Sequence, residues 1–537
     1  MDNIKKGYEY AKEYYAKLGV DVDKAMEICD KTPISIHCWQ GDDVRGFEKR
    51  DGGLSGGIQT TGNYPGSART PEELRQDLDM VLKFFPGEKK INIHANYAET
   101  DTFVDRDEIK PEHFKNWADW AVERGIGIDF NPTYFSHPLS ENGTLSARDE
   151  KVREFWIRHG IASRRIGEYF YKRTGKTCVI NHWTPDGDKE FPIDTLSPRL
   201  RLKDSYDQIF EATKDVKGVM DGIESKVFGI GLESYTVGSH EFCMGYVMSK
   251  HSDHIMLTLD CGHYHPTEVV SAKLGAVYAF ADHCLLHVSR PVRWDSDHVV
   301  CYDDELKAIM DELVRLGKLN ATYIATDYFD ASINRIIAWL TGLRNARKAM
   351  LASLLTPVDE LKKFEAEGDN SSRLAVSQLY KTAPVGAVWD YYCAKKNAGV
   401  GKEWIEEVKK YEKEIKNEAE LLIKTDYFKK ILLQDFNNQT PQEIDYKEIY
   451  NIIKAMYCYF KSIELSSICF NLYKSNNELI ETYIKLLSKG KNAIKWLFLN
   501  KEKKKETENS FEQLKKEQKG FFYSNSISTL NELEKLS

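Results

Sequence analysis

The stretch HIMLTLDCGH, residues 254–263, runs from β-forming residues into Asp260, Gly262 and His263. It is one of eight short β-rich runs that are separated by longer stretches with helical periodicity. The eight predicted strands are residues 33–39, 90–97, 125–135, 177–183, 222–229, 254–263, 284–291 and 322–330. Strands that alternate with helices in this way predict parallel pairing through helical crossovers.

Eight such units favour an α/β fold of the (β/α)₈ TIM-barrel type. The connecting helices are clearest at residues 70–85, 149–173 and 303–317. A doubly wound open sheet is the alternative, but no GxGxxG motif follows the first strand, so the dinucleotide-binding form of that sheet has little support. We also expect an amphipathic helix at the N-terminus and a helical extension after the eighth strand.

The composition shifts near residue 415, and we place a domain boundary there. Residues 1–415 form the predicted barrel domain, and residues 416–537 form a second, mostly helical segment rich in Lys and Asn. That segment holds 20 Lys against 17 Asp plus Glu, a balance of only +3, which gives thin support for nucleic-acid binding. Three interpretations of this segment stay open: an appended helical interaction domain, a fusion produced by a lost stop codon or an assembly error, and a degraded remnant of a neighbouring regulator.

The composition of the 537-residue chain narrows its class. The formal net charge of -8 argues against a general binder of nucleic acids. Ten cysteines without a CxxC pair are typical of reduced thiols in a cytoplasmic protein. The polar N-terminus does not resemble a signal peptide, and no apolar run approaches the roughly 20 residues of a membrane span. We therefore expect a cytoplasmic protein with neither membrane nor nucleic-acid partners.

Chemically active side chains follow four consecutive predicted strands. In a parallel barrel such residues meet at the carboxyl ends of the strands. They are Glu224 and Lys226 on the fifth strand, Asp260 and His263 at the end of the sixth, His287 with Asp295 and Asp297 around the seventh, and Asp327 with Asp330 after the eighth. So many carboxylates would repel one another and raise each other's pKa unless a cation offset their charge. Mixed carboxylate and imidazole ligands suit Mn²⁺, Mg²⁺ or Co²⁺, and the number of donors is sufficient for two ions.

Each of these residues also has a simpler explanation. A single Asp at a strand end is most often a helix cap or a turn residue, and Asp295 with Asp297 could lie in a solvated loop. If residues 287–300 are extended, however, both of these aspartates share one face. Trp39, Trp183 and His94 are individually more typical of packing residues. The functional interpretation depends on the coincidence of donors at four successive strand ends.

Long motifs resemble the L-rhamnose isomerase family over roughly residues 1–415. They are IHCWQGDDVRGFE (36–48), ESKVFGIGLESYTVGSHEF (224–242), LDCGHYHPTEV (259–269), LLHVSRPVRWDSDHVV (285–300), DYFDASINRIIAWLTGLRN (327–345) and AVWDYYCA (387–394). The resemblance implies a (β/α)₈ barrel, a homotetramer, and Mn²⁺-dependent interconversion of the small sugars L-rhamnose and L-rhamnulose in rhamnose catabolism. Co²⁺ and Mg²⁺ are the substitute ions that we expect.

The resemblance also assigns residues to two Mn²⁺ sites in each subunit. The structural site is similar to one made by Glu224, Asp260, His287 and Asp327. The catalytic site is similar to one made by His263, Asp295 and Asp297, of which His263 and Asp295 also contact the substrate. Lys226 resembles the active-site lysine of the family.

The chemistry of aldose–ketose conversion agrees with these assignments. One hydrogen moves from C2 to C1 and one proton from O2 to O1, and cations at both oxygens would stabilise the negative charge that develops. We favour direct hydride transfer, with the O2 proton moved through water near Lys226 and Asp327. An enediol route with Glu224 or a histidine as base stays open. We further expect His94 to assist ring opening and Trp39 and Trp183 to pack against the sugar.

Two other functions remain in competition. One is another metal-dependent barrel of the xylose-isomerase-like group, an epimerase or an endonuclease, or an isomerase of a different aldose. The other is a catalytically silent barrel whose helical tail binds a protein partner. The WDSD motif at residues 294–297 and the DxxH pair of Asp260 and His263, together with Lys226, favour the rhamnose enzyme.

Overall fold

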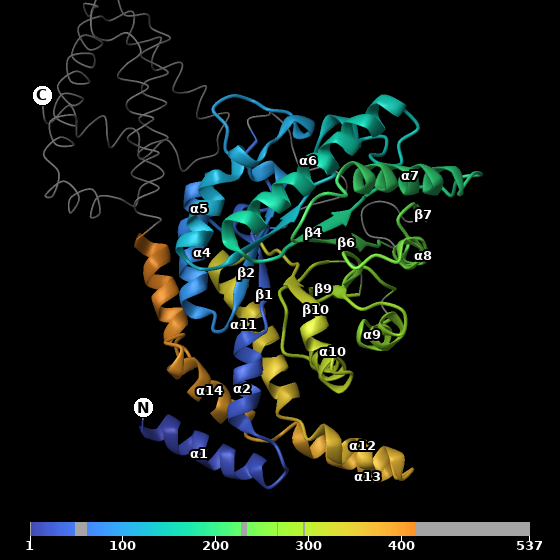
Figure 1. Ribbon diagram of the computed structural model, residues 1–537. Helices are drawn as coiled ribbons and strands as arrows, with labels where there is room; N and C mark the ends of the chain where they lie inside the picture. Colours follow the sequence, from blue (N-terminus) through green and yellow to red (C-terminus); the bar gives the residue numbers. More distant parts are fainter. Residues whose placement is uncertain (1, 49–61, 227–233, 266, 294–295, 415–537) are drawn as a thin grey trace, which may run out of the picture. The chain divides into compact units, whose positions relative to one another are not determined.

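Eight parallel strands close into a barrel in the computed structural model, which describes residues 2–48, 62–226, 234–265, 267–293 and 296–414 (Figure 1). Around the barrel the hydrogen-bonded order of the strands is β1-β10-β9-β8-β6-β4-β3-β2. The barrel strands are β1 (Ile34–His37), β2 (Lys89–His94), β3 (Gly127–Asn131), β4 (Cys178–Trp183), β6 (Val219–Glu224), β8 (Ile255–Asp260), β9 (Cys284–Val288) and β10 (Thr322–Thr326). The predicted barrel is confirmed, and the open sheet is excluded.

Helices connect the strands and extend the fold at both ends (Figure 1). The helices that belong to the barrel connections are α3 (Trp39–Asp42), α4 (Pro71–Phe84), α5 (Lys115–Glu123), α6 (Glu150–Thr174), α7 (Ser197–Ala212), α8 (His240–Lys250), α9 (Ser271–Tyr278) and α10 (Asp304–Arg315). The terminal helices are α1 (Asp2–Ala16), α2 (Val22–Lys31), α11 (Arg335–Leu354), α12 (Val358–Ala366), α13 (Asn370–Tyr380) and α14 (Val385–Lys395). A small antiparallel pair, β5 (Gly187–Asp188) and β7 (Tyr235–Thr236), lies outside the barrel.

Helix α10 illustrates how the sequence specifies these elements. The side chain of Asp303 accepts a hydrogen bond from the Leu306 backbone N–H and so caps the start of the helix. Two acidic residues in the first turn and Arg315 in the last turn complement the helix dipole. The buried residues Leu306, Ile309, Met310 and Leu313 follow the i, i+3, i+4, i+7 spacing of one helix face. This face packs against α9 and α11, so the predicted helix at 303–317 forms as expected.

The fifth barrel strand differs from its prediction. It spans Val219–Glu224 rather than 222–229, so Glu224 is its last residue and Lys226 lies two residues beyond it. A charged residue is unusual in a buried strand, so the sequence around Asp221 does not indicate where this strand begins. Its carboxylate is buried against the guanidinium of Arg164 at 3.0 Å and against His182 Nε2 at 2.9 Å, which offsets the cost of burial.

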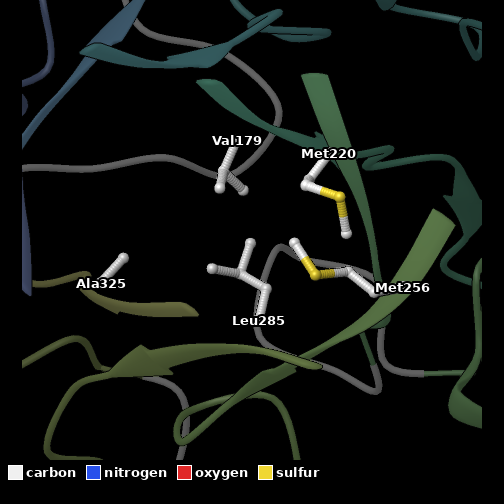
Figure 2. Packing of buried hydrophobic residues seen from close by; sticks show 5 residues of the cluster. All are labelled: Val179, Met220, Met256, Leu285 and Ala325. Atoms are coloured by element: carbon white, nitrogen blue, oxygen red, sulfur yellow. The ribbon is translucent and has the colours of Figure 1, made fainter. Parts of the chain in front are cut away.

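Five apolar side chains fill the barrel interior below the carboxyl ends of the strands (Figure 2). They come from five neighbouring strands, and we refer to them as the apolar layer: Val179, Met220, Met256, Leu285 and Ala325. Figure 2 shows them directed toward one another across the interior. Side chains alternate along a strand, so a residue two positions after each of these also faces the interior. The packing of this layer therefore fixes which residues lie above it.

The chain divides into two compact units, residues 1–409 and 410–537. The predicted boundary at residue 415 and the predicted helical segment 416–537 fall in or next to a part of the chain outside the described residues, so both stay predictions. Among the helices of the described ranges, none is both long enough and apolar enough to cross a lipid bilayer.

Candidate active site

Four of the predicted site residues lie at the carboxyl ends of four neighbouring barrel strands. Glu224 ends β6, Asp260 ends β8, His287 is the penultimate residue of β9, and Asp327 directly follows β10. The parallel register places Asp260 opposite His287. These strands are hydrogen-bonded to one another in this order around the barrel, so their ends bring the four side chains together. We call these four residues the central cluster.

The central cluster is organised around one imidazole nitrogen. His287 Nδ1 lies 3.1 Å from Glu224 Oε1, 3.2 Å from Asp327 Oδ2 and 3.5 Å from Asp260 Oδ2. One donor atom from each of the four residues lies within 4.8 Å of all the others. Glu224, Asp260 and His287 are buried, and Asp327 is half-buried. The arrangement is therefore a compact group of three oxygens and one nitrogen that is largely withdrawn from water.

A second ring of hydrogen bonds orients the three carboxylates. Each carboxylate accepts one hydrogen bond from outside the central cluster with the oxygen that faces away from His287. The donors are the amide of Asn181 to Glu224 Oε2 (2.5 Å), the backbone N–H of Gly262 to Asp260 Oδ1 (2.6 Å) and the indole N–H of Trp39 to Asp327 Oδ1 (3.0 Å). The other oxygen of each carboxylate is thereby left directed at the centre.

The electrostatics of the central cluster favour a positive charge at its centre. Burial acts against an imidazolium, but the three carboxylates outweigh it and raise the pKa of His287 well above its ordinary value. Burial and the neighbouring negative charges raise the pKa of Asp260 well above its usual range. For Asp327, burial is outweighed by the hydrogen bond and charge of His287, which hold its pKa at about 2. The protein thus stabilises a cation among these carboxylates.

The donor set fits a hard divalent cation. Oxygen and imidazole ligands bind such ions at about 2.0–2.2 Å, so ligands on opposite sides lie roughly 4.0–4.4 Å apart. The 4.8 Å limit within the central cluster is close to this value. Carboxylates mixed with an imidazole, without a thiolate, suit Mn²⁺, Mg²⁺ or Co²⁺. These four residues could therefore hold one metal ion.

Of the second predicted set, the structure describes His263 and Asp297. His263 Nδ1 lies 2.8 Å from the carbonyl oxygen of Ser225 and donates to it, which makes Nε2 the ring atom that could bind a cation. Burial lowers the pKa of His263 to about 3, so the ring is neutral. Burial raises the pKa of Asp297 to about 7, and the charge of Asp327 adds to this shift. Asp295 lies outside the described residues.

Lys226 lies beside both sets of residues. It is buried, and burial lowers the pKa of its ammonium group although Asp297, Asp260 and other carboxylates act in the opposite direction. Its Nζ is 5.6 Å from the centre of a Trp183 ring. A buried ammonium among carboxylates is suited to holding or releasing a proton.

Two carboxylates that follow the last two barrel strands differ from the simplest strand pattern. Asp297 has a φ of +42°, so the backbone at this residue is not extended. Asp330 is a turn residue, since its Oδ1 accepts hydrogen bonds from the backbone N–H and the hydroxyl of Ser332 at 2.8 and 2.5 Å. It does not belong to the central cluster.

Aromatic side chains form a wall beside the central cluster. Trp39, Trp183, Phe135 and Val44 make one buried apolar group, against which Phe329 packs. The ring of His94 is stacked on Trp39 with centroids 4.4 Å apart, and burial lowers the pKa of His94 to about 3. His94 is therefore a neutral group. The indole of Trp39 both packs in this wall and holds Asp327, which links the apolar wall to the central cluster.

Sequence reasoning missed Asn181, the side chain that holds Glu224. Asn181 is buried near the end of β4 and accepts a hydrogen bond from the Thr258 hydroxyl of β8. The available signal was a polar amide within TCVINHW, two positions from Trp183 on the same face of the strand. A strand that is otherwise apolar seldom buries an amide unless the amide has a partner.

Comparison with known proteins places the whole described region in one family. The sequence model of L-rhamnose isomerase (RhaA) matches residues 2–419. The L-rhamnose isomerase of Mannheimia succiniciproducens is 54% identical over 415 residues, which cover 77% of this chain and 99% of that protein. The L-rhamnose isomerase of Salmonella gallinarum is 52% identical over 413 residues, 77% of this chain and 98% of that protein.

Among solved structures, one of an L-ribulose 3-epimerase covers 63% of this chain and 97% of its own at 13% identity, with a TM-score of 0.39. This likeness is too weak to distinguish one sugar from another. The match over residues 2–419 and the identity above 50% are decisive instead. The chain belongs to the L-rhamnose isomerase family.

Proposed function

We propose that the chain interconverts L-rhamnose and L-rhamnulose by a metal-dependent aldose–ketose isomerisation. The observation that carries this proposal is the central cluster, in which three carboxylate oxygens and one imidazole nitrogen point at a common centre. Membership of the L-rhamnose isomerase family supports the choice of sugar. The reaction needs no redox cofactor, because the hydrogen lost by C2 is gained by C1.

Two cations are proposed in each subunit, with Mn²⁺ as the native ion and Co²⁺ or Mg²⁺ as substitutes. Glu224, Asp260, His287 and Asp327 would hold the structural ion. His263 and Asp297, together with Asp295, would hold the catalytic ion. When bound, the ions supply Lewis-acid stabilisation of negative charge on O1 and O2 of the sugar.

The side chains of the protein position the sugar and move its hydroxyl proton. Lys226 lies among carboxylates with its pKa lowered by burial, so it can hold or release a proton near O1 and O2. Asp327, held by Trp39, is the proposed partner in that transfer. Hydrogen passes directly from C2 to C1 in the route that we favour. Appearance in solvent water of deuterium placed at C2 would instead support the enediol route, with Glu224 as the candidate base.

The aromatic wall is proposed to bind the apolar side of the sugar. Trp39 and Trp183 belong to the same buried group as Phe135, beside the central cluster. Stacked aromatic rings exclude water and pack against C–H groups and the methyl group of a deoxy sugar. His94 is proposed to assist opening of the sugar ring as a neutral donor or acceptor, because its pKa of about 3 keeps it uncharged at neutral pH.

A homotetramer in the cytoplasm is proposed as the working state. Exposed apolar side chains gather on the segment that leads into α7 and on its first turn: Phe191, Ile193, Leu196 and Leu200. An apolar group of this kind is typical of an interface between subunits. Every cysteine of the described residues is a free thiol, which suits a reducing compartment.

The test is ketose formation by the full chain after removal of metal with a chelator. We expect no L-rhamnulose from the stripped protein and full activity after Mn²⁺ is added back. Glu224→Gln should remain inactive with Mn²⁺, whereas Glu48→Gln, which changes a carboxylate bonded to Arg106, serves as the matched control. A folded chain that binds Mn²⁺ and yields no ketose from L-rhamnose would refute the proposal. Epimerised ketose from a ketose substrate would support the epimerase alternative, and inertness toward all sugars would support a silent barrel.

A further inference from the structure

A chain of buried hydrogen bonds crosses three barrel strands beneath the central cluster. The hydroxyl of Thr258 on β8 donates to Asn181 Oδ1 on β4 at 2.9 Å. The amide of Asn181 donates to Glu224 Oε2 on β6 at 2.5 Å. Relative exposure is 0% for Thr258, 1% for Asn181 and 4% for Glu224, so water does not compete for these bonds. The three groups form one continuous polar path in an otherwise packed interior.

The Glu224 carboxylate, at the end of this path, fixes which group donates in each of the two hydrogen bonds. An ionised carboxylate has no proton to donate, so Asn181 must present its NH₂ group to Glu224. Its carbonyl oxygen then faces Thr258, whose hydroxyl must donate. Reversing the amide would place two acceptor oxygens against each other at Glu224. The Glu224 carboxylate therefore sets the orientation of the Asn181 amide, and the Thr258 hydroxyl holds the amide in that orientation by donating to Oδ1.

Gly222 provides the space for the path. It lies on β6 between the other two strands, opposite Asn181 in the β4 register. A methyl group at Gly222 would lie 2.4 Å from the Thr258 hydroxyl oxygen and 3.4 Å from Asn181 Oδ1. The first of these distances is shorter than any van der Waals contact. A side chain at Gly222 would thus displace the Thr258 hydroxyl that holds the amide oxygen of Asn181.

We propose that Asn181 and Thr258 are positioning residues for Glu224. By holding Oε2, Asn181 turns Oε1 toward the centre, where it lies 3.1 Å from His287 Nδ1. A carboxylate that is held in place loses less rotational freedom when it binds a cation, so this path raises cation affinity. The inference rests on the proposed metal-dependent function, because it assigns these residues to the binding of that ion.

The experiment measures Mn²⁺ affinity directly. Free Mn²⁺ is followed by electron paramagnetic resonance during titration of the chelator-stripped full chain. Asn181→Asp replaces the donor by an acceptor of the same shape, and we expect Mn²⁺ binding about 10–100-fold weaker. Thr258→Val removes the hydroxyl at constant shape and should weaken binding by about tenfold. Thr258→Ser retains the hydroxyl and should restore affinity to within about twofold of the unchanged protein.

Thr322→Val is the matched control. Thr322 begins β10 at the opposite end of the barrel, and its hydroxyl is bonded to Tyr278 and to the carbonyl oxygen of Lys318. This variant loses a buried hydroxyl from a barrel strand but should keep the original Mn²⁺ affinity. Thermal unfolding in chelator establishes that each variant is folded. If Asn181→Asp does not fold, the Thr258→Val and Thr258→Ser pair decides the question.

Mn²⁺ affinities within twofold of the unchanged protein for both Asn181→Asp and Thr258→Val would overturn the inference. A starting protein that binds no Mn²⁺ would overturn it as well. If the starting protein binds Mn²⁺ but forms no ketose from L-rhamnose, the proposed function fails while the comparison of affinities still holds. The two proposals are therefore tested by separate readouts of the same samples.

Discussion

The apolar layer and the central cluster use the same barrel strands for opposite purposes. On β9, Leu285 belongs to the apolar layer and His287, two residues later, belongs to the central cluster. At the end of β10, Ala325 and Asp327, the residue that follows the strand, have the same relation. Two residues of a strand span roughly 6.5 Å. Within that distance the interior changes from apolar side chains, whose burial is favourable, to charged side chains, whose burial costs free energy.

The apolar layer stabilises the fold, whereas the central cluster provides the chemical groups of the proposed reaction. Burial of the apolar layer contributes to folding by removing apolar surface from water. Burial of three carboxylates around one histidine costs free energy unless a cation offsets the repulsion. Substitutions in the two regions should therefore have opposite profiles, one acting on stability and the other on activity. Three experiments test this contrast.

The largest effect is expected for Asp260→Asn. This change keeps the shape of the side chain and the acceptor for the Gly262 N–H but removes one negative charge. We expect kcat/KM for L-rhamnose to fall by about 10²–10³-fold. In chelator, the free energy of unfolding should rise by roughly 1 kcal/mol because carboxylate repulsion is relieved. Sugar kinetics and urea unfolding measure the two effects.

Asp330→Asn is the control for this prediction. Asp330 also follows β10, but its carboxylate accepts hydrogen bonds from the neighbouring Ser332 in its turn and is not a proposed cation ligand, so near-original activity is expected. A marked loss of stability for Asp260→Asn in chelator would contradict the contrast, since it would mean that the charged cluster supports the fold.

The next effect is expected for Leu285→Ala in the apolar layer. Leu285 is 2% exposed, so truncation leaves a cavity, and the free energy of unfolding should fall by about 2–5 kcal/mol. The kcat of the folded fraction should stay within about tenfold of the original, because Leu285 belongs to the apolar layer and is not a proposed cation ligand. Leu374→Ala, at a residue 63% exposed on α13, should change stability by less than about 0.5 kcal/mol. An inactive but equally stable Leu285→Ala would reverse the assignment.

The smallest effect concerns Asp42, a carboxylate buried away from the central cluster. Burial raises its pKa to about 7, although hydrogen bonds from the Tyr97 hydroxyl and the Gly46 N–H act to lower it. A raised pKa means that the folded state keeps a proton that the unfolded state has released. Stability therefore falls as pH rises from about 4 to 7, by at most about 1.4 kcal/mol per pH unit from this group.

Urea unfolding of the chelator-treated chain at pH 5, 6 and 7 measures this slope. Asp42→Asn cannot ionise, so the difference in stability between the variant and the original should shift in favour of the variant as pH rises. A difference that stays constant over this range would show that Asp42 ionises normally in the folded state. The hydrogen bonds from Tyr97 and Gly46 would then be sufficient to stabilise the ionised carboxylate of Asp42.

The sequence predicted the architecture because each strand and helix carries a local signal. All eight barrel strands lie within or next to their predicted ranges, and the helix at 303–317 shows its cap and its apolar face in the sequence itself. The approximate position of the central cluster followed from the rule that parallel strands present their carboxyl ends together.

The parts that escaped prediction depend on distant partners. Asp221 fits in β6 because Arg164 and His182, both far away in sequence, contact its carboxylate. Asn181 acquires its role only from Glu224 and Thr258 on other strands. The left-handed backbone at Asp297 has only a weak local signal, since Asp tolerates this conformation but glycine is the residue that usually marks it. Contacts between residues that are far apart in sequence, rather than local hydrophobic periodicity, determine most of these features.

Strand alternation has a consequence for the gene. Deletion of one codon within β9 would reverse the facing of every residue on one side of the deletion, so either Leu285 or His287 would turn away from the interior. The same holds for the end of β10, where Ala325 lies two residues before Asp327, the residue that follows the strand. A change of length within these strands would therefore misplace the proposed cation ligands, whereas a substitution keeps the facing of the neighbouring residues.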